Sequence, residues 1–225
     1  MVNTPEALSD SVAESTITEI LALSKNIYGN ARSLYAGDWG YKRNHPGRDL
    51  AGKTLGILGF GRIGCAVAKK LAAFDVKVIA FDPFARPTEG VEFLSLEEVL
   101  QKSDYVSVHL PALKETEGSI GYAEFEMMKE TVYFINLGRG SIVREEEMIA
   151  ALKDKKIAGA ALDVYEVEPL PLTSSLLTLD NVLLTPHIAS NTVETRERMA
   201  IHAARGIIDV LADKNPKWAV NTIEK

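Results

Sequence analysis

The chain has 225 residues, of which 46% are hydrophobic and 25% charged, a composition typical of a globular protein with a sizeable core. Its formal net charge of -6 argues against a nucleic-acid-binding surface, which needs clustered Lys and Arg. The single cysteine excludes an intrachain disulfide and fits a reducing cytoplasm, and no run of about 18 apolar residues is present that would span a membrane.

The first predicted element is a long amphipathic helix. Thr4 is expected to cap it, with Pro5 at the first helical position, where proline is common. Apolar residues then recur at roughly helical spacing up to about Tyr28. The segment 35–52 carries Gly, Pro, aromatic and charged residues without periodicity, so we predict a loop there, one too aromatic to be a simple linker.

After Gly52, short apolar runs alternate with helical patterns. The predicted strands are 54–58, 77–81, 105–108, 132–135, 158–162 and 182–185. The predicted helices are 62–74, 95–102, 123–129, 144–154 and 192–213. Strands that are apolar on both faces and alternate with helices indicate βαβ units and a parallel sheet covered on both sides. About six such strands predict a doubly wound α/β fold of the Rossmann type, with strand order 3-2-1-4-5-6.

A glycine-rich turn directly follows the first of these strands. Gly59 permits the tight turn, Gly61 lets the backbone approach a pyrophosphate, and Gly64 allows the helix to pack close to the strand. Glycines also mark ordinary turns, but here the strand, the helix and the spacing all agree with a dinucleotide site. Cys65, in the first helical turn, is expected to be a small buried packing residue.

Asp82 ends the next predicted strand and supplies the second half of this pattern. A carboxylate at that position accepts hydrogen bonds from the adenine-ribose hydroxyls and repels a 2′-phosphate, so NAD is expected rather than NADP. Arg86 lies nearby and would soften that rejection, although it is interpreted as a solvated surface residue.

Three side chains at strand ends have the chemistry for carbonyl reduction. Such a reaction needs a cation for the substrate, a proton donor and a group that orients the donor. Arg139 is flanked by glycines and suits a carboxylate clamp, His187 suits the proton donor, and Glu168 suits the group that orients it. Taken singly, each also has an ordinary structural interpretation, and Glu166 is an alternative to Glu168.

The other ionisable candidates are weaker. His45 and His202 are interpreted as structural or solvated residues. With one cysteine and no close histidine pairs, no metal site is expected.

The ordered motifs GKTLGILGFGRIG, HLP…T, INLGRGSIV, GAALDVYEVEPLP and DNVLLTPHIAS resemble those of the D-2-hydroxyacid dehydrogenase family, over nearly the whole chain. This family includes D-3-phosphoglycerate dehydrogenase and glyoxylate/hydroxypyruvate reductase. The resemblance implies an NAD-dependent oxidoreductase that interconverts a small D-2-hydroxy acid and its 2-oxo acid by hydride transfer. It places the family's catalytic arginine, glutamate and histidine on Arg139, Glu168 and His187.

The resemblance also extends the expected NAD site. Arg62 and Ile63 would lie along the pyrophosphate, and Asp163 would bind the nicotinamide carboxamide. The full expected set is Gly59, Gly61, Arg62, Ile63, Gly64, Asp82, His109, Leu110, Pro111, Thr116, Leu137, Gly138, Arg139, Asp163, His187, Ala189 and Ser190.

The expected organisation is essentially one NAD-binding Rossmann domain over 1–225. It comprises an interdomain helix at 1–30, a core at 52–190, a return helix at 191–215 and a tail of a substrate domain at 216–225. Because the first residues resemble the junction that enters the interdomain helix, we expect the chain to lack most of the family's N-terminal substrate domain and to be weakly active or inactive alone.

The resemblance also implies a homodimer through the first helix and the 35–52 loop. A non-catalytic NAD(H)-binding interaction or regulatory protein is the alternative function. A short-chain dehydrogenase is excluded, because no Tyr-x-x-x-Lys occurs in the sequence.

Overall fold

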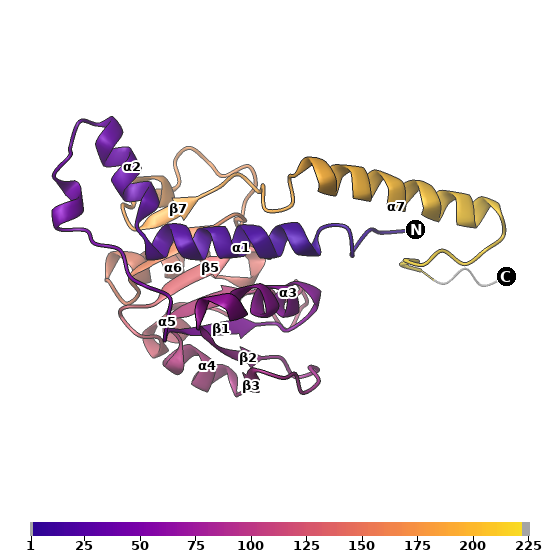
Figure 1. Ribbon diagram of the computed structural model, residues 1–225, viewed down its shortest axis with the longest axis horizontal. Coiled ribbons are helices and arrows are strands. Elements are labelled where there is room, and N and C mark those ends of the chain that lie inside the picture. The colour runs from indigo at the N-terminus through magenta and orange to yellow at the C-terminus, as the bar shows by residue number, and fades with distance from the viewer. Residues whose placement is uncertain (1, 222–225) are drawn as a thin grey trace.

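The computed structural model describes residues 2–221 and contains a seven-stranded, all-parallel sheet with helices on both faces (Figure 1). The strands are β1 (Thr54–Leu58), β2 (Lys77–Phe81), β3 (Val91–Phe93), β4 (Tyr105–Val108), β5 (Tyr133–Asn136), β6 (Gly159–Leu162) and β7 (Val182–Leu184). Their spatial order is β3-β2-β1-β4-β5-β6-β7. The predicted fold class, a doubly wound Rossmann-type sheet, is therefore confirmed.

Two helical layers cover the sheet. The α-helices are α1 (Ser9–Ser24), α2 (Ile27–Tyr35), α3 (Arg62–Leu71), α4 (Leu96–Lys102), α5 (Tyr122–Met127), α6 (Glu145–Lys153) and α7 (Val193–Leu211). Short 3-10 helices are η1 (Tyr41–Arg43), η2 (Ala72–Phe74), η3 (Gly140–Ile142) and η4 (Ser175–Thr178). The helices α1 and α3 pack together on one face, and α4, α5 and α6 pack on the other.

Burial on both faces explains why the strands read as continuous apolar runs. All four residues of β4 and all four of β6 are buried, and each face contributes its own apolar cluster. The register aligns the strand ends, so that Leu58 of β1 lies opposite both Phe81 of β2 and Val108 of β4. The loops that follow these strands therefore meet along one edge, where ligands of open α/β sheets bind.

The sheet has seven strands rather than six, because the prediction missed β3. This strand has only three residues, and the middle one, Glu92, is exposed, so it shows no apolar run. It forms the edge of the sheet beside β2, the position that the expected order gives to the third strand. The 105–108 strand consequently pairs with β1 and β5 instead of lying at the outer edge, as the order expected for six strands would require.

The N-terminal helix also differs from the prediction. It begins at Ser9 with Leu8 at the N-cap, whereas Thr4 lies in a turn in which its carbonyl accepts a hydrogen bond from the Ala7 amide. Asn26 then adopts a left-handed conformation (φ 48°) that separates α1 from α2, so the predicted continuous helix is two helices. The remaining predicted helices agree with the structure within about two residues at each end, apart from 62–74, whose last turn is the 3-10 helix η2.

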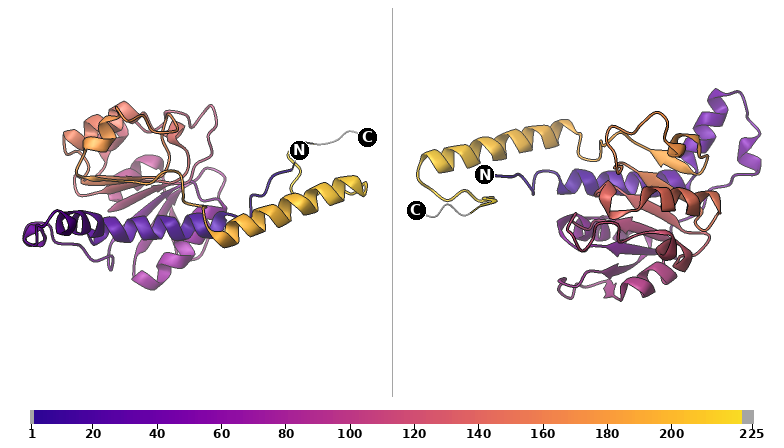
Figure 2. Two further views of the ribbon diagram at one scale, coloured as in Figure 1. Left: turned by 90° about the horizontal axis from the view of Figure 1, so that it is seen from above. Right: turned by 180° about the vertical axis from the view of Figure 1, so that it is seen from behind.

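The segment 35–52 is mostly loop, as predicted, but it includes the last residue of α2 and η1. The last helix, α7, extends away from the sheet, and the chain then turns back so that Val2 and Ala219 pair in an antiparallel bridge (Figures 1 and 2). Of the predicted tail at 216–225, residues 222–225 lie outside the described range. Within residues 2–221 no helix has the length and apolar character needed to cross a membrane.

Candidate active site and cofactor cleft

The glycine turn after β1 has the geometry that its three glycines predict. Gly59 has a φ of 93°, and a Cβ there would lie 2.7 Å from the backbone of His109. A Cβ on Gly64 would lie 2.5 Å from the Gly59 carbonyl oxygen. A Cβ on Gly61 would meet no heavy atom within 4 Å. Gly59 and Gly64 are thus required by the fold, whereas Gly61 borders open space.

The helix α3 starts immediately after this turn, at Arg62. Gly61 is its N-cap and provides no side-chain hydrogen bond, so the first-turn amides, which include that of Ile63, are not capped by that residue. Such amides, together with the helix dipole, suit an anionic group such as a pyrophosphate. Cys65 in the same turn is exposed, which corrects the expectation that it is buried.

Asp82 lies beside this turn, immediately after β2. One carboxylate oxygen accepts a hydrogen bond from the Phe60 amide and the other from the Phe84 amide, each at 2.8 Å. These bonds fix the orientation of the carboxylate while leaving it further lone pairs for ribose hydroxyls.

The chain after β4 lies against the glycine turn. His109 follows this strand, and its Nε2 is 2.9 Å from the Ser107 hydroxyl, while its Nδ1 is buried without a partner. Burial lowers the pKa of His109 to about 4, so its ring is neutral. Leu110 is half-buried and Pro111 exposed; Thr116 closes the following turn by donating a 2.6 Å hydrogen bond to the Pro111 carbonyl.

The Arg139 loop after β5 is shaped by a residue that the sequence analysis missed. The buried Asn136 side chain donates to the Arg139 carbonyl and accepts from the Gly138 amide, both at 3.0 Å. Leu137, which lies between Asn136 and Gly138 in the sequence, is buried. A polar residue that ends an otherwise apolar strand was the available signal for this role.

Glu168 and His187 form the pair that the sequence predicted. A Glu168 carboxylate oxygen lies 2.7 Å from His187 Nδ1, and the other accepts from the Tyr165 amide. Burial raises the pKa of Glu168, but these hydrogen bonds and the charges of His187 and Arg139 more than offset it and hold the pKa below its ordinary value. The ionised carboxylate therefore accepts a hydrogen bond from His187 Nδ1–H. The other ring nitrogen, Nε2, takes no part in this hydrogen bond.

The segment after β7 that carries His187 is held by Asp163. This carboxylate is fully buried and accepts hydrogen bonds from the Thr185 hydroxyl (2.5 Å), the Ile188 amide (2.7 Å) and the Ala189 amide (2.8 Å). Both oxygens are thus engaged by this segment, and the expected contact of Asp163 with a carboxamide stays a prediction.

One cavity collects the three predicted catalytic side chains. It has a volume of about 310 Å³ and is lined by Arg139, Glu168 and His187, with Ser141 and Tyr165 among its other walls. A mostly apolar cavity of about 620 Å³ lies along the same Glu168–His187 pair and includes Leu170, Leu177 and Leu184. A cation, a carboxylate–imidazole pair and apolar walls therefore meet at the carboxyl edge of the sheet.

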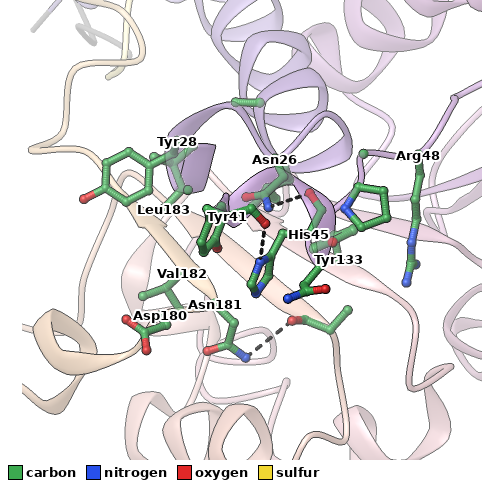
Figure 3. Close-up of a pocket in the computed structure, with 17 residues that line it drawn as sticks. Asn26, Tyr28, Tyr41, His45, Arg48, Tyr133, Asp180, Asn181, Val182 and Leu183 are labelled. Carbon is green, nitrogen blue, oxygen red and sulfur yellow. Dashed lines mark hydrogen bonds between the residues drawn. The ribbon is translucent and has the colours of Figure 1, made fainter. Parts of the chain in front are cut away.

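A further cavity of about 390 Å³ lies at the opposite edge, among α2, the 44–48 loop and the starts of β5 and β7 (Figure 3). Three of its polar side chains bond the main chain: His45 contacts the Tyr41 carbonyl, Asn181 donates to the Ala158 carbonyl, and Arg48 donates to the Thr131 carbonyl. It does not contain the predicted catalytic groups. Across residues 2–221, no cluster of three or more His, Cys, Asp or Glu side chains is arranged to hold a metal ion.

Comparison with known proteins identifies the family. Residues 17–189 match the family model of the D-isomer specific 2-hydroxyacid dehydrogenase, NAD binding domain. A glyoxylate reductase from Thermofilum pendens is 44% identical over 229 residues, covering 98% of this chain and 68% of the relative. A D-3-phosphoglycerate dehydrogenase from Archaeoglobus fulgidus is 40% identical over 225 residues, covering 98% of this chain and 42% of the relative.

A solved structure of a D-lactate dehydrogenase supports the same family. The D-lactate dehydrogenase with NAD+ from Lactobacillus jensenii superimposes with a TM-score of 0.89 at 28% identity, over 98% of this chain and 71% of the other. The fold, the glycine turn beside Asp82 and the sequence match converge, and the chain belongs to the NAD-dependent D-2-hydroxyacid dehydrogenases, with their NAD-binding domain at its centre.

Proposed function

We propose that this chain binds NAD(H) and contributes the acid–base and carboxylate-binding groups for interconversion of a small D-2-hydroxy acid and its 2-oxo acid. The observation that carries this proposal is the single cavity shared by Arg139, Glu168 and His187 at the carboxyl edge of the sheet. Relatives named glyoxylate reductase and D-3-phosphoglycerate dehydrogenase support the reaction class.

The residues of the cleft fit NAD. The open space at Gly61 and the uncapped start of α3 suit the pyrophosphate, and the fixed carboxylate of Asp82 suits the ribose hydroxyls. Bound NADH would supply the hydride. The nicotinamide end of the cleft is assigned to the positions after β5 and β7, which comprise Leu137, Gly138, Asp163, Ala189 and Ser190.

His187 moves the proton of the reaction. Its Nδ1–H is committed to Glu168 at 2.7 Å, so Nε2 is the atom that faces substrate. In reduction, the Nε2 proton of the imidazolium passes to the substrate carbonyl oxygen as the carbonyl carbon gains a hydride, which leaves a neutral ring. In oxidation the neutral Nε2 takes the hydroxyl proton back.

Arg139 binds the substrate carboxylate. Its guanidinium lies in the same cavity as His187 and donates one 2.7 Å hydrogen bond to the Gly138 carbonyl, which leaves other N–H groups for a carboxylate. Holding the carboxylate there places the adjacent carbonyl carbon in the cavity and its oxygen near His187 Nε2.

We propose that the 225-residue chain by itself turns over weakly or not at all. The His187 side chain is 51% exposed and Arg139 is also reached by solvent, so water competes for both groups. The chain spans 68% of the length of its glyoxylate reductase relative. Hydride transfer by the wild-type chain, however slow, would favour the enzyme over the alternative of a non-catalytic NAD(H)-binding protein.

We further propose a homodimer in a reducing cytoplasm. Exposed aromatic side chains support a protein contact at α2 and the loop after it, where Tyr35 is 93% and Trp39 is 69% exposed. Sedimentation at the monomer mass of 24.6 kDa across micromolar concentrations would overturn the dimer.

The decisive experiment separates binding from chemistry. NADH binding is followed by fluorescence, and a single turnover with glyoxylate or hydroxypyruvate is followed by NADH absorbance. Relative to the slow transfer of the wild-type chain, we expect His187→Ala to slow hydride transfer by at least about 100-fold while NADH affinity changes by less than about threefold.

Lys102→Ala, on the exposed side of α4, is the control and should change neither quantity. An unchanged transfer rate in His187→Ala would contradict the assigned role of the histidine. Absence of NADH binding at millimolar concentration would contradict the proposed function as a whole.

A further inference from the structure

A second buried acid, besides Asp163, lies close to the segment that carries His187. Glu19 extends from α1, is 6% exposed, and has one carboxyl oxygen 3.2 Å from the Thr185 hydroxyl, while its other oxygen is buried without a partner. The same hydroxyl lies 2.5 Å from Asp163. Glu19, Thr185 and Asp163 therefore form a continuous row, although they come from three distant parts of the sequence.

The protons available in this row determine which group donates each of its hydrogen bonds. The Thr185 hydroxyl has one proton, and the shorter distance directs it to Asp163, which also accepts two backbone amides. The contact between Thr185 and Glu19 then needs a proton from Glu19. Burial, and next the negative charge of Asp163, raise the pKa of Glu19 to about 8, so Glu19 carries that proton at neutral pH.

The row holds a strained segment in place. His187 adopts a left-handed conformation with a φ of 52°, which is unfavourable for a residue with a Cβ. Asp163 bonds Thr185 before it and Ile188 and Ala189 after it. The helix α1 adds a second anchor, since the Ser15 hydroxyl donates to the Ala189 carbonyl at 2.9 Å.

The charged and titratable groups around Glu19 would not neutralise it. Asp163 faces it from the end of β6, and Tyr165 nearby keeps its hydroxyl proton because burial and the acids around it raise its pKa. In the described part of the chain, the cationic side chains near α1 bond groups other than Glu19. Lys70 pairs with Glu14 and Asp10, and Arg198 donates to the Ala7 carbonyl and the Ser11 hydroxyl. The Arg48 guanidinium donates to the Thr131 carbonyl. Ionised Glu19 would therefore place a second negative charge beside Asp163.

We propose that Glu19 is a positioning residue whose protonated side chain holds the His187 segment through Thr185 and Asp163, and whose ionisation loosens that segment. The consequence for proton transfer rests on the function proposed above, whereas the positioning itself does not. Once Glu19 loses its proton, two carboxylates compete for one hydroxyl proton and one anchor of the left-handed His187 is weakened.

Amide hydrogen exchange of Ile188 and Ala189, measured by NMR from pH 6.5 to 9.5 without cofactor, tests this proposal. In the wild-type chain we expect exchange to accelerate about tenfold more between pH 7 and 9 than intrinsic base catalysis requires, because the segment opens more often. Glu19→Gln keeps a donor at the same place and cannot ionise, so its rates should follow intrinsic catalysis alone. Thr185→Val removes the hydroxyl that connects Glu19 to Asp163. The Ile188 and Ala189 amides of this variant should exchange faster than in the wild-type chain, with no excess pH dependence.

Glu14→Gln, on the exposed side of the same helix, is the matched control and should keep the wild-type excess. The proposal is overturned if Glu19→Gln retains that excess or if the wild-type chain has none. NADH titration of the same samples keeps the two proposals apart. Loss of NADH binding contradicts the proposed function, while the exchange of the Ile188 and Ala189 amides decides the role of Glu19.

Discussion

Two loops at the same edge of the sheet are built in opposite ways. The glycine turn after β1 depends on backbone shape: its requirements are a φ of 93° at Gly59 and the absence of a side chain at Gly64. The His187 segment after β7 depends on side chains from elsewhere, with Glu168 at 2.7 Å from the histidine and Asp163 bonded to the amides after it.

The two loops also differ in how their structures depend on titratable groups. The glycine turn is shaped mainly by backbone sterics, and the acid bonded to it, Asp82, contacts only the Phe60 amide there. A segment held by buried acids is tied to their protonation, since Glu19 is neutral only below its raised pKa of about 8. We therefore expect the glycine turn to be less sensitive to pH than the His187 segment.

The largest expected effect concerns stability as a function of pH. Because the pKa of Glu19 is raised from 4.5 to about 8, the folded chain retains a proton that the unfolded chain has lost. This stabilisation is fully present below pH 4.5 and is lost as the pH rises through 8. Relative to Glu19→Gln, the wild-type unfolding free energy should fall by on the order of 4 kcal/mol across that window.

Urea unfolding of the two proteins at pH 5, 6.5 and 8.5 measures the difference, and the other titrating groups cancel between them. Parallel stability curves would show that Glu19 is ionised throughout, and the contrast between the two loops would then be one of packing alone.

The next effect tests the backbone side of the comparison. Gly59→Ala combines a left-handed residue with a Cβ 2.7 Å from the His109 backbone, and should lower the unfolding free energy by about 3 kcal/mol at every pH. Gly61→Ala meets no neighbouring atom, so it should leave stability within about 0.5 kcal/mol of wild type while weakening NADH binding at least about tenfold.

Urea unfolding and NADH fluorescence titration distinguish these two variants. A stable Gly59→Ala chain would mean that the fold does not require glycine at this position. A Gly61→Ala chain with normal NADH affinity would mean that the backbone of this turn does not approach the cofactor as proposed.

The smallest effect concerns cofactor choice. Asp82→Asn removes the negative charge that would repel a 2′-phosphate, and it leaves an NH2 group facing one of the Phe60 and Phe84 amides that now bond the carboxylate. The ratio of NADH to NADPH affinity should fall about tenfold, which is about 1.4 kcal/mol. Competitive titration with both cofactors measures it, and an unchanged ratio would exclude Asp82 from the discrimination.

The sequence predicted the cofactor end of the molecule well. The apolar runs at 54–58, 77–81 and 105–108 are strands with those same bounds, and the GxGxxG pattern follows the first of them. Such patterns succeed because strand burial and turn shape depend on neighbouring residues. The edge strand β3, with its exposed Glu92, was not predicted, because it has no apolar run of its own. It is a strand because it pairs with β2.

At the catalytic end, the sequence by itself determined which residue types follow which strands, and it placed Arg139, Glu168 and His187 at one edge. Only the tertiary structure decided that Glu168 reaches His187 across 19 residues, and that Asn136 shapes the Arg139 loop. It alone showed that Glu19 lies against Thr185, 166 positions away. The physical reason is that a buried hydrogen bond depends on where helices and strands pack in three dimensions, which no local periodicity encodes.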